Sequence, residues 1–426
     1  MPMPSTLDNV EIPSRPIRGL NALAKTLLCR QLEQLTVDQI VLKDCETTTV
    51  FGRESEGALY ASLIIRHPDF YGQAVFGGSL GCAESYIQGE WDTDQLVDLI
   101  RILVRNRPVL DGLETGLARL ATPIRGLLHA MNRNTRSGSR KNIAAHYDLG
   151  NALFELFLDP TLMYSCARFE PESLSLEEAQ TAKLDGICRR LALQPTDHVI
   201  EIGTGWGGFA LHAARHYGCR VTTTTISQNQ YQRAFERIRD SGLEDRITLI
   251  QRDYRDLEGV YDKLVSIEMI EAIGHAYFET FFQVAGRLLK PDGLMLLQAI
   301  TLNDRHYLRA RDEVDFIKKY IFPGSCIPAI GPLLTAATQG SDLQLIHLED
   351  LAPHYALTLR HWRERFLDQQ DEVLKLGYSQ SFIRLWTFYL AYCEGGYAER
   401  ALGDIQAVFQ KPGYRGPMPP TPDIRR

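Results

Sequence analysis

The sequence predicts an α/β fold, a Rossmann-like, doubly wound parallel sheet preceded by a smaller α+β domain. From about residue 176 onward, short apolar runs alternate with helical patterns, which is typical of a parallel sheet covered by helices. A glycine-rich turn at 203–208 separates the first of these runs from an alanine-rich helical stretch. The 426 residues, of which 44% are hydrophobic, exceed one domain of usual size and can build a substantial core.

Residues 1–115 show the pattern of the small α+β domain, beginning with a loose arm over 1–14. Apolar residues at helical spacing predict a helix over 15–36. Alternating and apolar runs predict strands at 38–43, 47–52, 58–66 and 72–77. Glycines at 77–81 predict a turn, and a closing helix is predicted from Leu96, Leu99, Ile100 and Leu103.

Residues 116–140 are predicted to form a basic linker. Between 115 and 147 there is no Asp or Glu, and the basic residues are Arg119, Arg125, Arg133, Arg136, Arg140 and Lys141. A solvated linker and a segment that contacts anionic lipid head groups explain this pattern equally well. A catalytic domain is predicted over 141–412 and a proline-rich tail over 413–426.

Composition excludes several classes of protein. A net charge of −7 argues against a general nucleic-acid binder. The eight cysteines form no cluster with each other or with histidine, so neither a metal site nor a disulfide framework is predicted. The first residues lack the basic and apolar regions of a signal peptide, and no apolar run is long enough to span a bilayer. We therefore expect a cytoplasmic protein.

The strands of the second domain are predicted at 197–203, 220–226, 247–253, 263–269 and 293–300. In such sheets, ligands bind at the carboxyl ends of the strands. The glycine turn follows the first strand and fits two cofactors. Gly203, Gly205 and Gly208 match the dinucleotide fingerprint, which expects an acid about 20 residues on, but the next strand carries none. Glu201 before the first glycine is the usual arrangement for S-adenosylmethionine (SAM), which we favour over NAD and over a plain glycine turn.

Polar residues follow the other strands. The side chains after the second strand, up to Gln230, suit a ribose, although Ser227 alone would also serve as a helix cap. Asp253 is placed to accept from an adenine amino group, and Tyr254 to cover the ring. Glu271 follows the fourth strand in an apolar stretch, where a carboxylate needs a task or a partner. A polar and aromatic set before the sheet predicts a lid over the cofactor: His146, Tyr147, Tyr164 and Cys166.

With these residues in view, the chain resembles the cyclopropane fatty acid synthase family from about Lys141 to Lys411. The matching motifs are His146–Asn151, Tyr164–Ala167, Gly203–Gly208, Thr225–Ser227, Asp253–Leu257, Lys319–Gly324, Tyr355, Trp362–Phe366 and Asp404–Phe409. Gly81–Trp91 is similar to the family's N-terminal domain, more weakly. The resemblance implies SAM-dependent transfer of a methyl(ene) group to the double bond of unsaturated phospholipid acyl chains, at the inner membrane face and with a possible homodimer.

The resemblance also implies the roles of individual residues. The expected cofactor site comprises Tyr164, Ser165, Glu201, Gly203, Gly205, Gly207, Thr225, Ile226, Gln230, Asp253 and Tyr254. In the family, a bound bicarbonate is thought to remove a proton from the added methyl group. Its expected ligands here are Cys166, Glu271, Gln298, Ile300 and Tyr355. Aromatic residues could line an apolar tunnel that protects a carbocation, although each also suits an ordinary core: Phe316, Tyr320, Phe322, Trp362, Phe366, Trp386, Tyr389 and Tyr392.

The chain departs from the family motifs at three positions near the expected anion. Ala272 and Gln298 replace histidines, and Glu268 replaces a glycine. A cyclopropane remains the default product, but loss of a different proton would give a methylene- or methyl-branched chain. Two further hypotheses stay open: a non-catalytic lipid- or SAM-binding regulator and a small-molecule methyltransferase. Acyl length, double-bond position and head group are not predicted.

Overall fold

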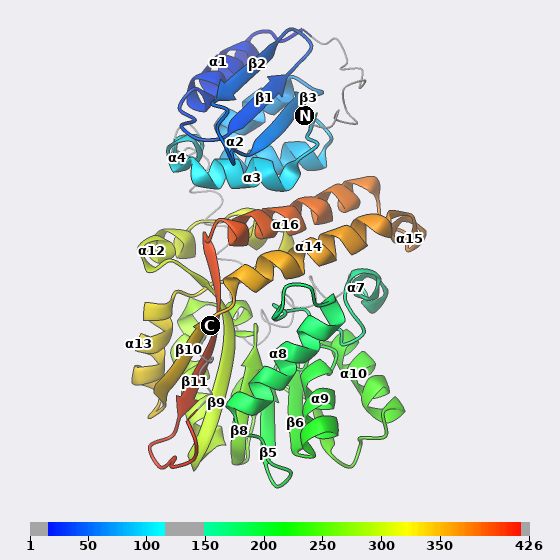
Figure 1. Cartoon of the computed structure of the whole chain (residues 1–426), viewed down its shortest axis with the longest axis vertical. Helices are drawn as coiled ribbons and strands as arrows, with labels where there is room; N and C mark the ends of the chain where they lie inside the picture. Colours follow the sequence, from blue (N-terminus) through cyan, green and yellow to red (C-terminus); the bar gives the residue numbers. More distant parts are fainter. Residues whose placement is uncertain (1–15, 116–148, 419–426) are drawn as a thin grey trace. The chain divides into compact units, whose positions relative to one another are not determined.

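The computed structural model describes residues 16–115 and 149–418, which divide into two compact units (Figure 1). Among these residues, unit 1 comprises 16–115, 313–321 and 362–401, and unit 2 comprises 149–312, 322–361 and 402–418. The predicted N-terminal arm, the basic linker, His146 and Tyr147 lie outside the described residues.

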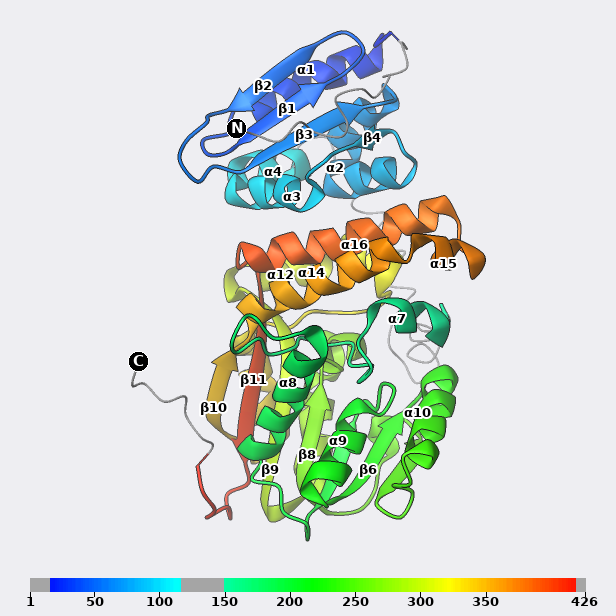
Figure 2. The same ribbon diagram turned by 45° about the vertical axis from the view of Figure 1, so that its right-hand side comes forward.

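Unit 1 contains a four-stranded sheet in the order β2-β1-β3-β4 (Figure 2). β1 pairs with β2 antiparallel and with β3 parallel, and β4 joins the other edge of β3 antiparallel. The strands are β1 Gln39–Lys43, β2 Thr48–Gly52, β3 Tyr60–Ile65 and β4 Trp91–Asp92. The helices of this part are α1 Leu20–Leu32, α2 Asp69–Ile87, α3 Leu96–Arg105 and α4 Arg107–Thr115.

The strand predicted at 72–77 is wrong, because this segment lies inside α2. The glycines that suggested a turn instead allow a kink and a close approach. Gly78 has φ 63° and ψ −149°, which breaks the helical path. A Cβ on Gly81 would lie 2.1 Å from the carbonyl oxygen of Gln73, so only glycine fits there.

Unit 1 also contains the helices α15 Gln370–Lys375 and α16 Gln380–Ala398, the end of α14 Ala352–Asp368, and the π-helical turn η5 Ile317–Ile321. α16 packs on α2 and α3. The Phe388 ring lies 5.6 Å from Tyr86 and 5.0 Å from Phe316, measured between centroids, and the guanidinium of Arg384 lies 4.0 Å from the Tyr86 ring centroid. This compact unit is therefore larger than the predicted domain over 1–115.

Seven of the eight aromatic residues predicted for the tunnel belong to unit 1, and Phe322 belongs to unit 2. Trp362, Phe366 and Trp386 are fully buried, whereas Tyr320 is 38% exposed and donates to Glu84. Their described contacts are those of an aromatic core, and the tunnel stays a prediction.

Unit 2 contains a seven-stranded sheet in the order β10-β11-β9-β8-β5-β6-β7, in which β11 alone runs against the other strands. The five predicted strands are confirmed as β5 His198–Ile202, β6 Arg220–Thr225, β7 Ile247–Gln251, β8 Tyr261–Ile267 and β9 Leu289–Leu302. Two further strands at one edge of this sheet were not predicted, β10 Gln344–Asp350 and β11 Leu402–Gln410.

Apolar cores lie on both faces of this sheet, which confirms the doubly wound architecture. One core is formed with α8 Leu176–Arg190, α9 Gly208–Tyr217 and α10 Gln228–Asp240. The other is formed with α11 Phe278–Leu288 and α13 Ile330–Gly340. The remaining elements are α7 Asn151–Phe157, α12 Asp304–Asp312 and the turns η2 Tyr254–Asp256, η3 Ile270–Ile273 and η4 His275–Tyr277.

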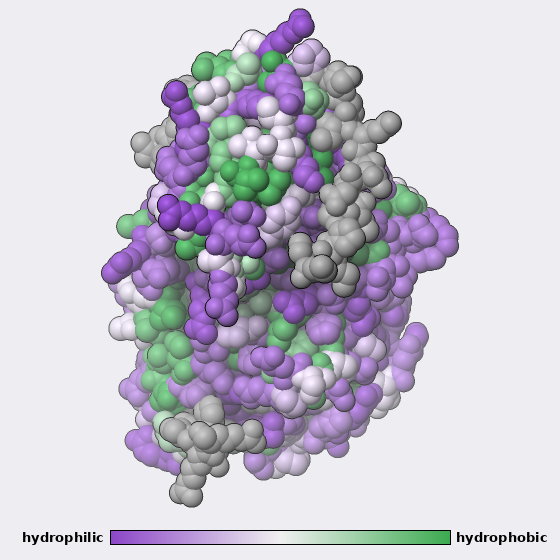
Figure 3. All heavy atoms as spheres, turned by 45° about the horizontal axis from the view of Figure 1, so that its top comes forward, coloured by the Kyte–Doolittle hydropathy of each residue, from purple (hydrophilic) through white to green (hydrophobic). Residues whose placement is uncertain are grey.

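Within the described ranges, no helix has both the length and the apolarity needed to cross a membrane. Figure 3 shows apolar side chains in small groups among polar ones on one face of the molecule. The exposed large apolar residues of unit 1 include Leu20, Leu23, Val50 and Tyr60. Contact with a membrane surface stays a prediction.

Glu349 joins edge strand β10 to the main body of unit 2, which leads to a first prediction. Its carboxylate accepts two hydrogen bonds from Arg168, at 2.9 and 3.0 Å, and is also paired with Arg190. We expect Glu349→Ala to lower the free energy of unfolding by about 3 kcal/mol at pH 7, because it leaves two mostly buried guanidinium groups without this partner. Denaturant titration measures the change, with the exposed Glu244→Ala as control.

The pH dependence of this effect has a definite sign. Burial opposes ionisation of Glu349, but the hydrogen bonds from Arg168 and the charge of Arg190 hold its pKa below the usual value. Its contribution is therefore present at neutral pH and is lost as the pH falls through the lowered pKa. The difference between the native protein and Glu349→Ala should shrink in acid; a constant or absent difference would contradict the assignment.

Candidate active site

The glycine turn after β5 has a backbone conformation that favours glycine. Gly203, Gly205 and Gly207 have φ angles of 103°, 53° and 86°. The N–H groups of Gly203 and Thr204 donate to the carbonyl oxygen of Thr224 at 3.1 and 2.9 Å, which holds the turn against β6. A Cβ on Gly205 would meet no atom of the described residues within 4 Å. The turn thus leaves room for a ligand near the first N–H groups of α9.

Glu201, at the end of β5, is buried below this turn. Its carboxylate accepts a 2.6 Å hydrogen bond from Thr223 Oγ1, which lies 2.6 Å from Thr204 Oγ1. Burial raises the pKa of Glu201 to about 8. Through Thr223 and Thr204, Glu201 is connected by hydrogen bonds to the turn, and direct contact with the cofactor stays a prediction.

The residues after β6 form a local network. Thr225 Oγ1 donates to Gln230 Oε1 at 2.9 Å, and Ser227 Oγ accepts from the N–H of Gln230 at 3.3 Å. Ser227 is therefore the N-cap of α10, as one of the two predictions had it. Ile226, between these residues, is partly buried.

Asp253, after β7, is already paired. Its carboxylate accepts from Arg255 N–H, Nε and Nη2 at 3.0, 2.8 and 2.6 Å. The Arg255 guanidinium lies 5.6 and 5.2 Å from the ring centroids of Tyr254 and Tyr277. An adenine amino group would therefore share this carboxylate with Arg255, a competitor that the sequence analysis overlooked.

The loop that carries Tyr164 and Cys166 is fastened to the glycine turn. Arg237, on α10, donates to the carbonyl oxygens of Pro160, Thr161 and Trp206. A Cβ on Gly208 would lie 2.5 Å from Met163 Sδ, so glycine is needed for this approach. Arg237 was not singled out from the sequence, since nothing in the local pattern distinguishes it from the other arginines of its helix.

α7 contacts the glycine turn and the Tyr164 loop through Asn151 and the Phe154 ring. The indole N–H of Trp206 donates to Asn151 Oδ1 at 2.8 Å. The Phe154 ring lies 4.9 Å from Trp206 and 5.2 Å from Tyr164, between centroids. Asn151 of the predicted lid motif thus contacts the turn.

A carboxylate lies where the resemblance implies an anion. Glu268 accepts from the backbone N–H of Cys166 and from Gln298 Nε2, both at 2.8 Å, and from the Tyr355 hydroxyl at 2.6 Å. Cys166, Gln298 and Tyr355 are three of the five predicted bicarbonate ligands. Burial raises the pKa of Glu268, whereas the hydrogen bonds from Tyr355 and Cys166 act to lower it. The residues do not fit bicarbonate at these donors, because a side chain of the protein already takes them.

The other two predicted ligands also meet, around Glu271. Its Oε1 accepts from the N–H of Ile300 at 2.6 Å, and its Oε2 is buried with no described hydrogen bond. Burial, followed by repulsion from Glu268, raises the pKa of Glu271 to about 8. The five predicted ligands therefore lie together: Cys166, Gln298 and Tyr355 contact Glu268, and Ile300 contacts Glu271, the fifth of them.

Two further residues complete this centre. Gln298 Nε2 also donates to Asp404 Oδ2 at 3.1 Å, and burial with repulsion from Glu268 raises the pKa of Asp404 well above its usual value. Lys183, on α8, is 1% exposed and donates to Ser165 Oγ at 2.8 Å. Lys183 lies on the same face of α8 as the buried residues Leu176, Ala179 and Ile187. A charged residue on an apolar helix face is a signal in the sequence, but it was not used in the prediction.

The Cys166 thiol is not a nucleophile in this arrangement. It donates to the carbonyl oxygens of Ala167 and Leu351 at 3.2 and 3.6 Å, and burial raises its pKa well above the usual value. Its backbone N–H donates to Glu268. Burial and the hydrogen bonds of the thiol both disfavour the reactive thiolate form.

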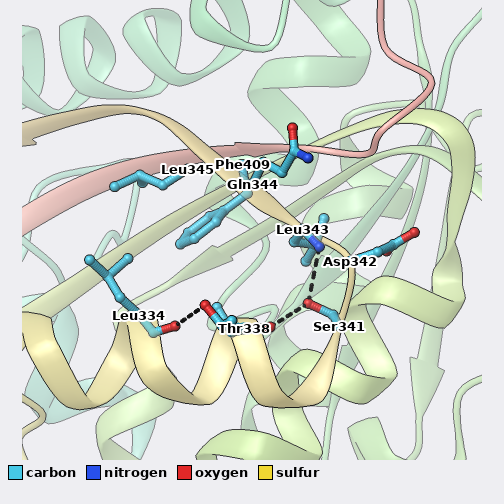
Figure 4. A pocket seen from close by; sticks show the side chains of 9 residues that line it. Leu334, Thr338, Ser341, Asp342, Leu343, Gln344, Leu345 and Phe409 are labelled. Atoms are coloured by element: carbon cyan, nitrogen blue, oxygen red, sulfur yellow. Dashed lines mark hydrogen bonds between the residues drawn. The ribbon is translucent and has the colours of Figure 1, made fainter.

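A hollow at the edge of the sheet lies elsewhere in unit 2. It is bounded by α13, β10 and β11, with Leu334, Thr338 and Phe409 among its lining residues (Figure 4). None of the predicted site residues lines it.

Known proteins match both the sequence and the fold. The profile of the family described as mycolic acid cyclopropane synthetase matches residues 134–407. The tuberculostearic acid methyltransferase UfaA1 of Mycobacterium tuberculosis is 35% identical over 95% of this chain and 94% of its own length. The cyclopropane-fatty-acyl-phospholipid synthase of Escherichia coli is 36% identical over 83% of this chain and 89% of its own.

Solved structures agree with these matches. The mycolic acid cyclopropane synthase CmaA1, in complex with S-adenosylhomocysteine (SAH), has a TM-score of 0.60 at 31% identity, covering 64% of this chain and 98% of that one. Coclaurine N-methyltransferase, at 21% identity and a TM-score of 0.59, shares the fold. Because the family profile covers more than half of the chain, the chain belongs to the mycolic acid cyclopropane synthetase family of SAM-dependent methyltransferases.

Proposed function

We propose that this enzyme methylates a double bond in an unsaturated phospholipid acyl chain and that Glu268 accepts the proton released afterwards. Family membership makes it a SAM-dependent enzyme acting on fatty-acid unsaturations. The finer assignment rests on one observation, the three hydrogen bonds that hold the Glu268 carboxylate among the predicted anion ligands.

The cofactor side suits SAM. The open space at Gly205, next to the N-terminus of α9, accommodates a ligand, and Tyr164 packs on Phe154, which in turn contacts Trp206 of the same turn. When bound, SAM supplies an electrophilic methyl group that adds to the alkene and leaves a positive charge on the neighbouring chain carbon. No step is assigned to bicarbonate.

Glu268 is suited to remove the next proton. Its two oxygens accept hydrogen bonds from three different segments of the chain, so the carboxylate has a fixed position in a partly buried site. A C–H bond of the added methyl carbon breaks, its proton goes to the carboxylate, and its electron pair either closes a three-membered ring or forms a double bond. The second outcome requires a prior shift of hydride between the two former alkene carbons.

We favour the methylene-branched product over the cyclopropane that the sequence analysis takes as the default. The relative that matches over 95% of this chain is named a tuberculostearic acid methyltransferase and not a cyclopropane synthase, and a hydride shift before proton loss converts the secondary cation into the more stable tertiary one. The cyclopropane remains the second candidate, because a cyclopropane synthase is among the relatives that match over most of the chain. A saturated methyl branch would also need a reductant.

The phospholipid form of the substrate, the anionic membrane surface and a homodimer are proposals of the same kind. They rest on the resemblance and on the basic residues of the predicted linker, which lie outside the described residues.

Glu268→Gln is the direct test of the proton acceptor. The amide keeps the size of the side chain but cannot take up the proton, so we expect turnover to fall at least ~100-fold. SAH affinity, measured by calorimetry, should change little. Turnover close to that of the native enzyme would exclude Glu268 as the acceptor.

Glu268→Gly gives a matched second test. Glu268 has φ 47°, a conformation that glycine adopts more easily, so this variant should fold. It removes the carboxylate from the anion position, and added bicarbonate should restore part of its activity, whereas Glu268→Gln should not respond. The native enzyme should work equally well in carbonate-free buffer; a requirement for bicarbonate there would contradict the proposal.

The product can be identified after incubation with SAM and vesicles of a defined monounsaturated phospholipid. We expect the acyl group of the product to contain one carbon more than that of the substrate, as an exomethylene branch. This group takes up hydrogen under mild catalysis and gives alkene signals by NMR. A product that resists mild hydrogenation and gives cyclopropane signals would establish the second candidate. If the enzyme acted on free fatty acids but not on phospholipids, the phospholipid substrate would be excluded.

A further inference from the structure

Lys183 is a buried cation without an assigned role. It lies on α8 with 1% of its surface exposed, and its described hydrogen bond goes to the neutral hydroxyl of Ser165 at 2.8 Å. Burial lowers the pKa of Lys183 to about 8. A buried ammonium is costly unless opposite charges compensate for it, so its presence here requires an explanation.

The compensating charges are those of the reaction centre. Glu268 acts most strongly to keep Lys183 charged, and Asp159 and Asp404 add to the effect. Lys183 in turn favours the ionised form of Glu268 and of Glu201, below the glycine turn. One ammonium thus acts on both the proton acceptor and the cofactor side.

The other titratable groups near Glu268 do not replace this charge. They are Asp404 of β11, Glu271 of η3, the Tyr355 hydroxyl of α14 and the Cys166 thiol of the preceding loop. Two of them are acids that repel a charge on Glu268. Among the described residues that act on Glu268, Lys183 supplies the positive charge.

We propose that Lys183 is a positioning residue whose buried ammonium keeps Glu268 ionised and thus ready to accept a proton. Its hydrogen bond to Ser165 Oγ at 2.8 Å holds the ammonium beside the residue that precedes Cys166, whose backbone N–H donates to Glu268 at 2.8 Å. The inference rests on the proposed function of Glu268 and adds the residue that controls its charge.

The test is the pH profile of kcat/KM for Lys183→Met, Lys183→Gln and Lys183→Arg. Loss of the cation makes Glu268 harder to ionise, so the acid limb of the profile should move to higher pH by about one unit in Lys183→Met and Lys183→Gln. On the acid side, this equals about a tenfold loss of rate. Lys183→Arg keeps the charge and should stay near the native profile.

Lys263→Met is the matched control. Lys263 is also mostly buried, on β8 of the same unit, but its ammonium lies 5.6 Å from the Tyr414 ring centroid and belongs to no part of the site. Its profile should not move. Thermal denaturation separates folding defects from catalytic ones, and the polar Gln variant serves if Met does not fold.

Two results would overturn the inference. An unshifted acid limb in a folded Lys183→Gln or Lys183→Met variant would mean that Lys183 does not act through Glu268. A loss of SAH affinity without a shift would make Lys183 a residue of the cofactor side only. Failure of the proposed function is distinguishable, because it would show as an active Glu268→Gln enzyme whatever the Lys183 variants do.

Discussion

The set of hydrogen bonds to the Glu268 carboxylate is the constraint on which the active site depends. Its donors lie 102, 30 and 87 residues away, in the loop before α8, in β9 and in α14. These hydrogen bonds therefore bring a loop, a strand and a helix to one point at the carboxyl end of the sheet. Displacing any of them would remove a hydrogen bond from a partly buried carboxylate, which needs such bonds to stay ionised there.

The same centre is unfavourable for folding in other respects. Glu268 has a left-handed backbone conformation, and Glu201, Glu271 and Asp404 are buried acids whose pKa values are raised first of all by burial. Strain and unfavourable charge persist where the surrounding structure fixes them and where the chemistry uses them. A fully apolar centre of this size would be more stable, but it could not accept a proton.

Sequence patterns predicted the elements with local signals and failed where partners are distant. The strands β5 to β9 and the glycine turn follow from periodicity and turn chemistry. The strand predicted at 72–77 was wrong because this segment is helical and the glycines that follow it, Gly78 and Gly81, serve a helix kink and close packing, which only the tertiary structure specifies. The strands β10 and β11 were not predicted; each follows a helical segment and lies outside the regular alternation of strands and helices. All five predicted anion ligands lie together, but the contact of three of them with Glu268 was not predictable, since these donors are far away in sequence.

The choice between a ring and a methylene branch depends on timing at this centre. Both products lose a proton from the same added carbon, so the position of the acceptor does not separate them. What separates them is whether the cation rearranges before the proton leaves. That interval grows as the acceptor becomes a weaker base, and its basicity is set by its hydrogen bonds, by the charge of Lys183 and by the neighbouring acids. The residues around Glu268 therefore influence which lipid is made as well as how fast.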